Sequence, residues 1–187
     1  MEKVAEYFYY NHDTIKGGEF GYNRSHWSDM PEGYVYHTGI DLSGDSSIKN
    51  CFHGTVRRVE MNHVYYGNFV ETIFNLKYYG DFQDQLVYIR YKHLEKINPS
   101  VSVGFLINVG DPIGRMGNTG KSKGKHLHLE VVQRNVKHGR RTVLMENIIS
   151  VLGIPESGLN EVFVWQWGNV YINPLTLINY VKRVTKK

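Results

Sequence analysis

Cysteine is almost absent from this sequence, since Cys51 is the only one in 187 residues. A single thiol cannot close a disulfide within the chain, so a disulfide-stapled scaffold and a cysteine-rich zinc finger are both excluded. Long hydrophobic runs are missing as well: no stretch approaches the roughly 20 apolar residues that a membrane-spanning helix needs. The start, MEKVAEYFYYNHD, has no apolar run behind a basic head, and we expect no secretory leader in this chain.

A strong excess of charge of either sign is also lacking. Lys and Arg number 22 against 18 Asp and Glu, which gives a net charge of +4 and a pI near 9.0. This mild positive charge suits an anionic partner such as a cell wall, a membrane surface or nucleic acid, without choosing among them. Apolar residues make up 41% and charged residues 21%, which is typical of one folded domain and argues against extended disorder.

Helical periodicity is scarce in the first two thirds of the chain, where short β-rich runs are bounded by Gly, Asn and Asp. The clearest runs are Thr55–Met61, Asn68–Leu76, Leu86–Lys92 and Leu127–Gln133. They predict a mainly β fold with an antiparallel sheet core that extends from about Gly17 to Asn135.

The last third of the chain has a different character. The basic, Gly-containing segment Val136–Arg141 is typical of a loop or hairpin tip, and Glu146–Leu152 has the spacing of a short helix that ends at Gly153. Asn173-Pro174 is typical of a helix start, and predicts a short C-terminal helix. We expect an N-terminal segment, 1–16, followed by one domain, 17–187, with an inserted segment at about 136–171.

Histidine is the residue type most able to carry chemistry here. His126 and His128 are two residues apart in a run where Leu127, Leu129 and Val131 alternate with polar residues, so both imidazoles should share one strand face. Two neighbouring imidazoles can both bind a metal ion, or one can bind it while the other transfers a proton.

A second set of polar residues precedes this strand. His37 and Asp41 flank a Gly in a segment too turn-like for a helix, so both side chains can converge where a strand meets a loop. Two histidines and a carboxylate suit Zn²⁺ with an open fourth position for water. His93 lies in the fragment Tyr91-Lys-His-Leu, and strand alternation predicts that Tyr91 shares its face.

These fragments occur within a longer pattern. The run 113–130, IGRMGNTGKSKGKHLHLE, resembles the most diagnostic stretch of the LytM/lysostaphin-type zinc metallopeptidases, peptidase family M23, in which a Gly-rich loop leads directly into H-L-H-[FL]-E. The segment 37–42, HTGIDL, matches the first metal motif of that family without a gap. Further matching segments follow in the expected order: FGYNR at 20–24, GTV at 54–56, YGN at 66–68, YKHL at 91–94, VGDPIG at 109–114 and NP at 173–174.

The resemblance implies a zinc-dependent endopeptidase that cuts peptide stems or crossbridges of bacterial peptidoglycan. It assigns one Zn²⁺ to His37, Asp41 and His128, and makes His93 and His126 the catalytic pair. No H-E-x-x-H occurs in the chain, so these two histidines must replace the glutamate base of helix-borne zinc peptidases, while a zinc-bound water attacks the carbonyl. Which of the two is the general base is left open.

Two departures from the family pattern fall outside these five residues. The segment Val136–Tyr171 is longer than the short hairpin usual in the family, and Asn50-Cys51 stands where an Ala-Pro step is usual. Both can reshape the groove walls. The implied partner is peptidoglycan peptide rather than nucleic acid. The implied location is the periplasm or the cell exterior, with the leader outside this chain, and a phage-encoded hydrolase also fits.

Three alternative interpretations fit the sequence less well. A non-catalytic relative that binds the wall or activates another hydrolase normally lacks a ligand or a catalytic histidine, and none is missing here. A lipoyl-carrier-like module, suggested by VGDPI at 109–113, offers no reason for H-x-H. Gly120-Lys121-Ser122 resembles the end of a phosphate-binding loop, but the required Gly at position 115 is Arg and the next segment is strand-like.

Overall fold

The computed structural model describes residues 12–23, 36–136 and 140–185. The strands are β1 His12–Thr14, β2 Ile40–Gly44, β3 Ser47–Lys49, β4 Gly54–His63, β5 Gly67–Asn75, β6 Leu86–Ile97, β7 Leu106–Ile107, β8 Pro112–Met116, β9 Leu127–Gln133, β10 Phe163–Gln166 and β11 Asn169–Ile172. The helical segments are η1 Leu76–Tyr78, α2 Val143–Leu152, η2 Glu156–Gly158, α3 Leu159–Val162 and α4 Pro174–Thr185.

Every strand pairing among the described residues is antiparallel, which confirms the predicted mainly β fold. The sheet runs in the order β1-β2-β9-β6-β5-β4-β7, and β8 joins β3 to β6. The four predicted runs fall on β4, β5, β6 and β9, whose limits differ from the prediction by a few residues. β6 is the longest, and it pairs with β9 along its first half and with β8 along its second.

The core lies against one face of β6 and β9. Ile89 and Tyr91 of β6 and Leu129 and Val131 of β9 alternate with polar residues, and all four are essentially inaccessible to solvent. Fully burying an aliphatic side chain of this size stabilises a fold by about 1.5–3 kcal/mol. The opposite face of the same strands is also buried, although it carries charged side chains.

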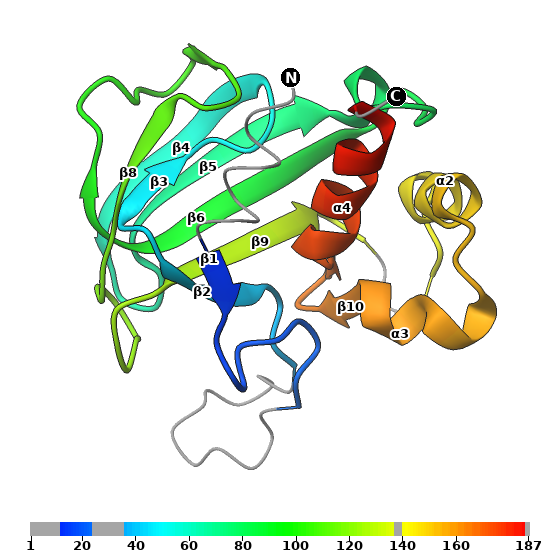
Figure 1. Cartoon of the computed structure of the whole chain (residues 1–187), viewed down its shortest axis with the longest axis horizontal. Coiled ribbons are helices and arrows are strands. Elements are labelled where there is room, and N and C mark those ends of the chain that lie inside the picture. The colour runs from blue at the N-terminus through cyan, green and yellow to red at the C-terminus, as the bar shows by residue number, and fades with distance from the viewer. Residues whose placement is uncertain (1–11, 24–35, 137–139, 186–187) are drawn as a thin grey trace.

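The C-terminal part adds three helices beside the sheet (Figure 1). Gly153 ends α2 with a φ of 63°, as predicted. The helix starts three residues earlier than expected, where the side chain of Thr142 caps it. α4 begins at Pro174 directly after Asn173, which confirms the predicted helix start. The predicted loop at 136–141 lies partly outside the described residues.

Within the segment 136–171, the hairpin β10–β11 extends the sheet rather than forming a separate unit. β11 pairs with β9 in a register that places Tyr171 opposite Val132. At the other edge, β1 pairs with β2, so residues 12–14 of the expected N-terminal segment also belong to the sheet. No described helix has both the length and the apolar character that a bilayer crossing requires.

Candidate metal centre

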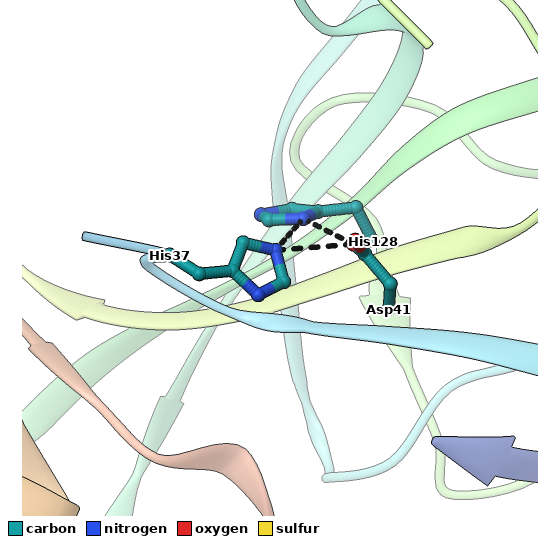
Figure 2. Close-up of side chains that lie close together, drawn as sticks. All are labelled: His37, Asp41 and His128. Carbon is teal, nitrogen blue, oxygen red and sulfur yellow. Dashed lines mark hydrogen bonds and ion pairs between the residues drawn. The ribbon is translucent and has the colours of Figure 1, made fainter. Parts of the chain in front are cut away.

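Three side chains from two neighbouring segments of the sheet meet at one point (Figure 2). His37 Nε2 lies 3.0 Å from His128 Nδ1 and 3.1 Å from an oxygen of Asp41. The same Asp41 oxygen lies 2.8 Å from His128 Nδ1. The structure therefore brings together the three residues that the sequence pattern singled out for a metal ion.

Strand pairing explains why these residues meet. Asp41 of β2 lies directly opposite His128 of β9, and His37 precedes β2 in the segment that enters the sheet. A side chain at Gly39 would place its Cβ 2.3 Å from the carbonyl oxygen of Leu129 and 2.9 Å from the ring of His128. Only glycine lets the 37–41 segment approach β9 closely enough to bring His37 to the site.

The outer nitrogen of His37 sets the protonation of its ring. His37 Nδ1 lies 2.9 Å from the carbonyl oxygen of Glu19, which can only accept a hydrogen bond. His37 must therefore carry its proton on Nδ1 and donate it, which leaves a lone pair on Nε2 in the neutral imidazole. That lone pair is the form of histidine that binds a metal ion.

His128 is oriented in the same way by a different partner. Its Nε2 lies 3.0 Å from a carboxylate oxygen of Glu130, a buried acidic residue two positions along β9. Donation from Nε2 leaves the lone pair on Nδ1, the atom that faces His37 and Asp41. Tautomers are inferred here from the surrounding acceptors.

The three atoms that face one another are thus two imidazole nitrogens, each with a lone pair, and a carboxylate oxygen. Burial alone would raise the pKa of Asp41, but the contacts with His128 and His37 outweigh it and hold this pKa well below its usual range. Three electron-rich atoms about 3 Å apart repel one another unless a cation lies among them. Their separations are compatible with the roughly 2.0–2.2 Å bonds of zinc, so the residues fit a zinc ion with a position left for water.

His93 reaches the same site through a distortion of β6. Its φ is 62°, which is uncommon for a residue with a side chain, and it lies where β6 changes partner from β9 to β8. Its ring centroid is 4.9 Å from that of His126 and 5.9 Å from that of His128. The left-handed backbone turns His93 out of regular alternation and towards the metal centre.

This distortion corrects the prediction that Tyr91 shares a face with His93. Tyr91 is fully buried in the core, where its hydroxyl accepts a hydrogen bond from the backbone N–H of Cys51 and donates one to the Asn50 side chain, both at 2.9 Å. Regular alternation would have placed His93 there as well, and it fails because the bulge shifts the pleat by one residue.

Burial determines the charge of His93. Removal from water, with a smaller electrostatic contribution from His128, lowers the pKa of His93 to about 3. His93 is therefore neutral near pH 7. Its Nδ1 lies 2.8 Å from the carbonyl oxygen of Thr119, so Nδ1 carries the proton and Nε2 is an acceptor.

His126 precedes β9 and lies near the same carboxylate. Its Nε2 is 3.5 Å from the Asp41 oxygen, and its Nδ1 is 2.8 Å from the carbonyl oxygen of Gly124. About 13% of its side chain remains exposed, so this ring is in contact with solvent. All five predicted site residues consequently lie in one cluster.

The Gly-rich loop holds the outer nitrogens of His93 and His126. Thr119 donates its hydroxyl to the backbone carbonyl of Leu94 and accepts from the backbone N–H of Asn68. Gly67 packs so tightly on this loop that a Cβ would lie 2.2 Å from the Thr119 hydroxyl. Lys121, Lys123 and Lys125 are exposed on the loop, as the sequence suggested.

Charged residues that the sequence analysis did not single out form a network beside the site. Burial lowers the pKa of Lys92 to about 8 despite the opposing effect of Glu130. Burial would raise the pKa of Glu130, but Lys92 and His128 hold it well below its usual range. Arg90 donates to Glu71 at 2.8 Å and to Glu130 at 3.3 Å. The position of Glu130, two residues after His128 on the same strand, could have indicated that the two side chains share a face.

The segment 136–171 also reaches the metal centre indirectly. The side-chain oxygen of Gln166, at the end of β10, accepts the backbone N–H of Tyr36 at 3.2 Å. Tyr36 immediately precedes His37, so this bond anchors the segment that carries the first predicted ligand. Nothing in the local sequence around Gln166 indicates this role.

The chain is similar to a known protein family and to solved structures. The model of peptidase family M23 matches residues 35–140, which is more than half of the chain. The catalytic domain of the antimicrobial peptidase lysostaphin from Staphylococcus simulans is similar in fold, with a TM-score of 0.51 and 23% identity over 68% of this chain and 84% of that one.

Two further solved structures resemble the chain less in overall fold. The catalytic domain of the prophage-encoded M23 protein EnpA from Enterococcus faecalis has a TM-score of 0.45 and 23% identity, over 65% of this chain and 78% of that one. A zinc-containing peptidase from Vibrio cholerae has a TM-score of 0.48 and 26% identity over 65% of this chain. The matches span 33% of that protein and 37% of a Pseudomonas aeruginosa structure.

Proposed function

This chain belongs to peptidase family M23, and from that membership we propose that it is a zinc-dependent endopeptidase acting on peptide stems or crossbridges of bacterial peptidoglycan. We also propose that residues 17–187 form the peptidase domain, with about 136–171 as an insertion in it. The observation that carries the proposal is the meeting of His37, Asp41 and His128, with the lone pairs of both imidazoles facing one carboxylate oxygen.

His37, Asp41 and His128 would hold the zinc ion. When bound, zinc supplies a Lewis acid that lowers the pKa of a bound water and polarises a peptide carbonyl. Asp41 contributes the one negative charge of the ligand set, which leaves the centre with net positive charge. Burial of His37 and His128, and the small exposed fraction of the Asp41 side chain, about 13%, strengthen their interaction with a cation.

His93 and His126 would carry out the proton transfers. His93 is neutral, buried and fixed at Nδ1 by Thr119, so its Nε2 can accept a hydrogen bond and orient the attacking water. His126 is partly exposed, so its Nε2 can take up a proton and return it to the leaving amine. This division of roles is our assignment.

The substrate and location extend the proposal. Peptidoglycan lies outside the cytoplasm, so we propose that the protein acts in the periplasm or outside the cell. A hydrolase encoded by a phage also fits this proposal. The exposed lysines of the Gly-rich loop would favour approach to an anionic wall.

Zinc content and wall lysis test the proposal directly. The purified chain should bind one zinc ion and reduce the turbidity of isolated cell walls, and mass spectrometry of the products should show cut peptide bonds. Asp41→Ala should bind far less zinc and lose lysis, because two neutral imidazoles remain. His53→Ala removes an exposed histidine outside the cluster and should change neither property.

Two results would contradict the proposal in different ways. A wild-type chain that neither binds zinc nor clears walls would exclude the enzyme. A chain that binds walls and zinc without producing new peptide ends would favour the alternative, a non-catalytic module.

A further inference from the structure

Glu130 lies behind His128, on the side of the ring away from Asp41. One Glu130 oxygen is 3.0 Å from His128 Nε2, whereas the other nitrogen of this ring faces Asp41 and His37. About 1% of the Glu130 side chain is exposed, so water does not compete for this hydrogen bond.

Three further side chains point hydrogen-bond donors at the same carboxylate. The hydroxyl of Thr38 donates to Oε1 at 2.6 Å, Lys92 Nζ lies 2.5 Å from Oε1, and Arg90 donates to Oε2 at 3.3 Å. A carboxylate surrounded by donors acts only as an acceptor. His128 must then donate through Nε2, which leaves Nδ1 as the lone pair that faces the metal centre.

Lys92 is the least expected member of this group. It lies directly opposite His128 in the β6–β9 pairing, is about 2% exposed, and places its ammonium 3.8 Å from the ring centroid of Tyr66. Burying an ammonium and a carboxylate costs desolvation energy that their attraction often fails to recover. Replacing such a buried pair by apolar residues of similar volume is often neutral or stabilising in proteins, so stability alone does not account for the pair.

We propose that Glu130 is the positioning residue for His128, and that Lys92 holds Glu130 in place for that purpose. Glu130 fixes the tautomer and the direction of the ring, and Lys92 orients the carboxylate and balances its charge. The inference rests on the proposed zinc site, and concerns how that site reaches its affinity.

The test compares zinc binding in matched variants, measured by competition with a chromogenic chelator. Glu130→Leu should weaken zinc binding about 10–100-fold, the usual cost of losing the partner of a ligating histidine. Glu130→Gln keeps an acceptor oxygen and should retain part of the affinity. Lys96→Met, an exposed change on the same strand, should have no effect.

A double variant separates positioning from a structural role. Glu130→Leu with Lys92→Met removes both buried charges together, which avoids leaving one of them unpaired. Its urea midpoint should lie closer to that of the wild type than the midpoint of Glu130→Leu does, while its zinc affinity stays as low as in Glu130→Leu. A purely structural pair predicts recovery of zinc affinity in the double variant, and that result would overturn the inference.

Proton NMR of the zinc-loaded protein gives a second readout. The Nε2 proton of His128 should appear downfield and exchange slowly in the wild type and in Lys96→Met, and should lose this protection in Glu130→Leu. Wild-type protein without zinc would refute the proposed function. Zinc-bound wild type with an unprotected Nε2 proton would refute only the role of Glu130.

Discussion

The two faces of strands β6 and β9 are built from the same alternation but have opposite content. One face buries Ile89, Tyr91 and Leu129 in the apolar core, and the other buries Arg90, Lys92, His128 and Glu130. The apolar face gains free energy by leaving water, whereas each charge on the polar face must be matched by a partner. The core face therefore stabilises the sheet, while the polar face specifies the orientation of the side chains proposed as metal ligands.

The largest expected effect is a loss of catalytic activity on substitution of His126, one of the two histidines proposed to transfer protons. His126→Ala should lower kcat about 10²–10⁴-fold, the usual contribution of general acid–base catalysis, while zinc content stays unchanged. Peptide release from isolated walls and metal analysis of the same sample measure the two quantities. Loss of zinc together with activity would instead make His126 a ligand.

The core face should show the reverse pattern. Leu129→Ala leaves a cavity under a fully buried residue, and should lower the free energy of unfolding by about 2–5 kcal/mol. Zinc affinity of the folded fraction should remain that of the wild type. Urea unfolding with chelator titration tests both, and a large drop in affinity would show that the two faces are not independent.

His93 should make the stability of the folded protein depend on pH. Its folded pKa of about 3 lies below the ordinary 6.5, so between these values the unfolded chain binds a proton that the folded chain does not. Stability present above pH 6.5 is lost as the pH falls towards 3, by an amount on the order of a few kcal/mol.

Urea midpoints of the metal-free protein at pH 7 and pH 4.5 measure this effect. His93→Gln should lose less stability than the wild type over that interval, and His53→Gln, an exposed change, should behave as the wild type. Equal losses in all three proteins would show that His93 does not carry the acid sensitivity.

Gly39 lies against both the backbone of Leu129 and the ring of His128, so its substitution should change both stability and zinc affinity. A Cβ there would meet the Leu129 backbone and the His128 ring, and Gly39→Ala should destabilise the fold by about 1–3 kcal/mol through overpacking. Zinc affinity should fall as well, because β2 must move away from β9. Unchanged zinc affinity would show that the 37–41 segment tolerates the shift.

The smallest expected effect lies in the segment 136–171. Gln166→Leu removes the acceptor for the Tyr36 N–H, and should cost about 0.5–1.5 kcal/mol, seen as a few-fold loss of zinc affinity. Gln166→Glu keeps an acceptor oxygen at the cost of a buried charge, and should lose less zinc affinity than Gln166→Leu. Identical affinity in all three proteins would limit Gln166 to a local structural role.

Much of the fold could be predicted because its signals are local. Alternation identified β4, β5, β6 and β9, and the helix end at Gly153 and the helix start at Asn173-Pro174 follow from backbone hydrogen bonding at helix ends. The shared face of His126 and His128 follows from the same alternation. The hairpin β10–β11 was not predicted, because its pairing with β9 depends on contacts distant in sequence.

By itself, the sequence determined which residue types were available and how they repeat along each strand, because the pleat of a strand is a local property. The resemblance of its motifs to those of family M23 then implied His37, Asp41, His93, His126 and His128 as candidates. Only the tertiary structure decided that His93 breaks its alternation at a bulge, and that Glu130 and Lys92 lie behind His128. Register and burial set these contacts, and both depend on which strands become neighbours.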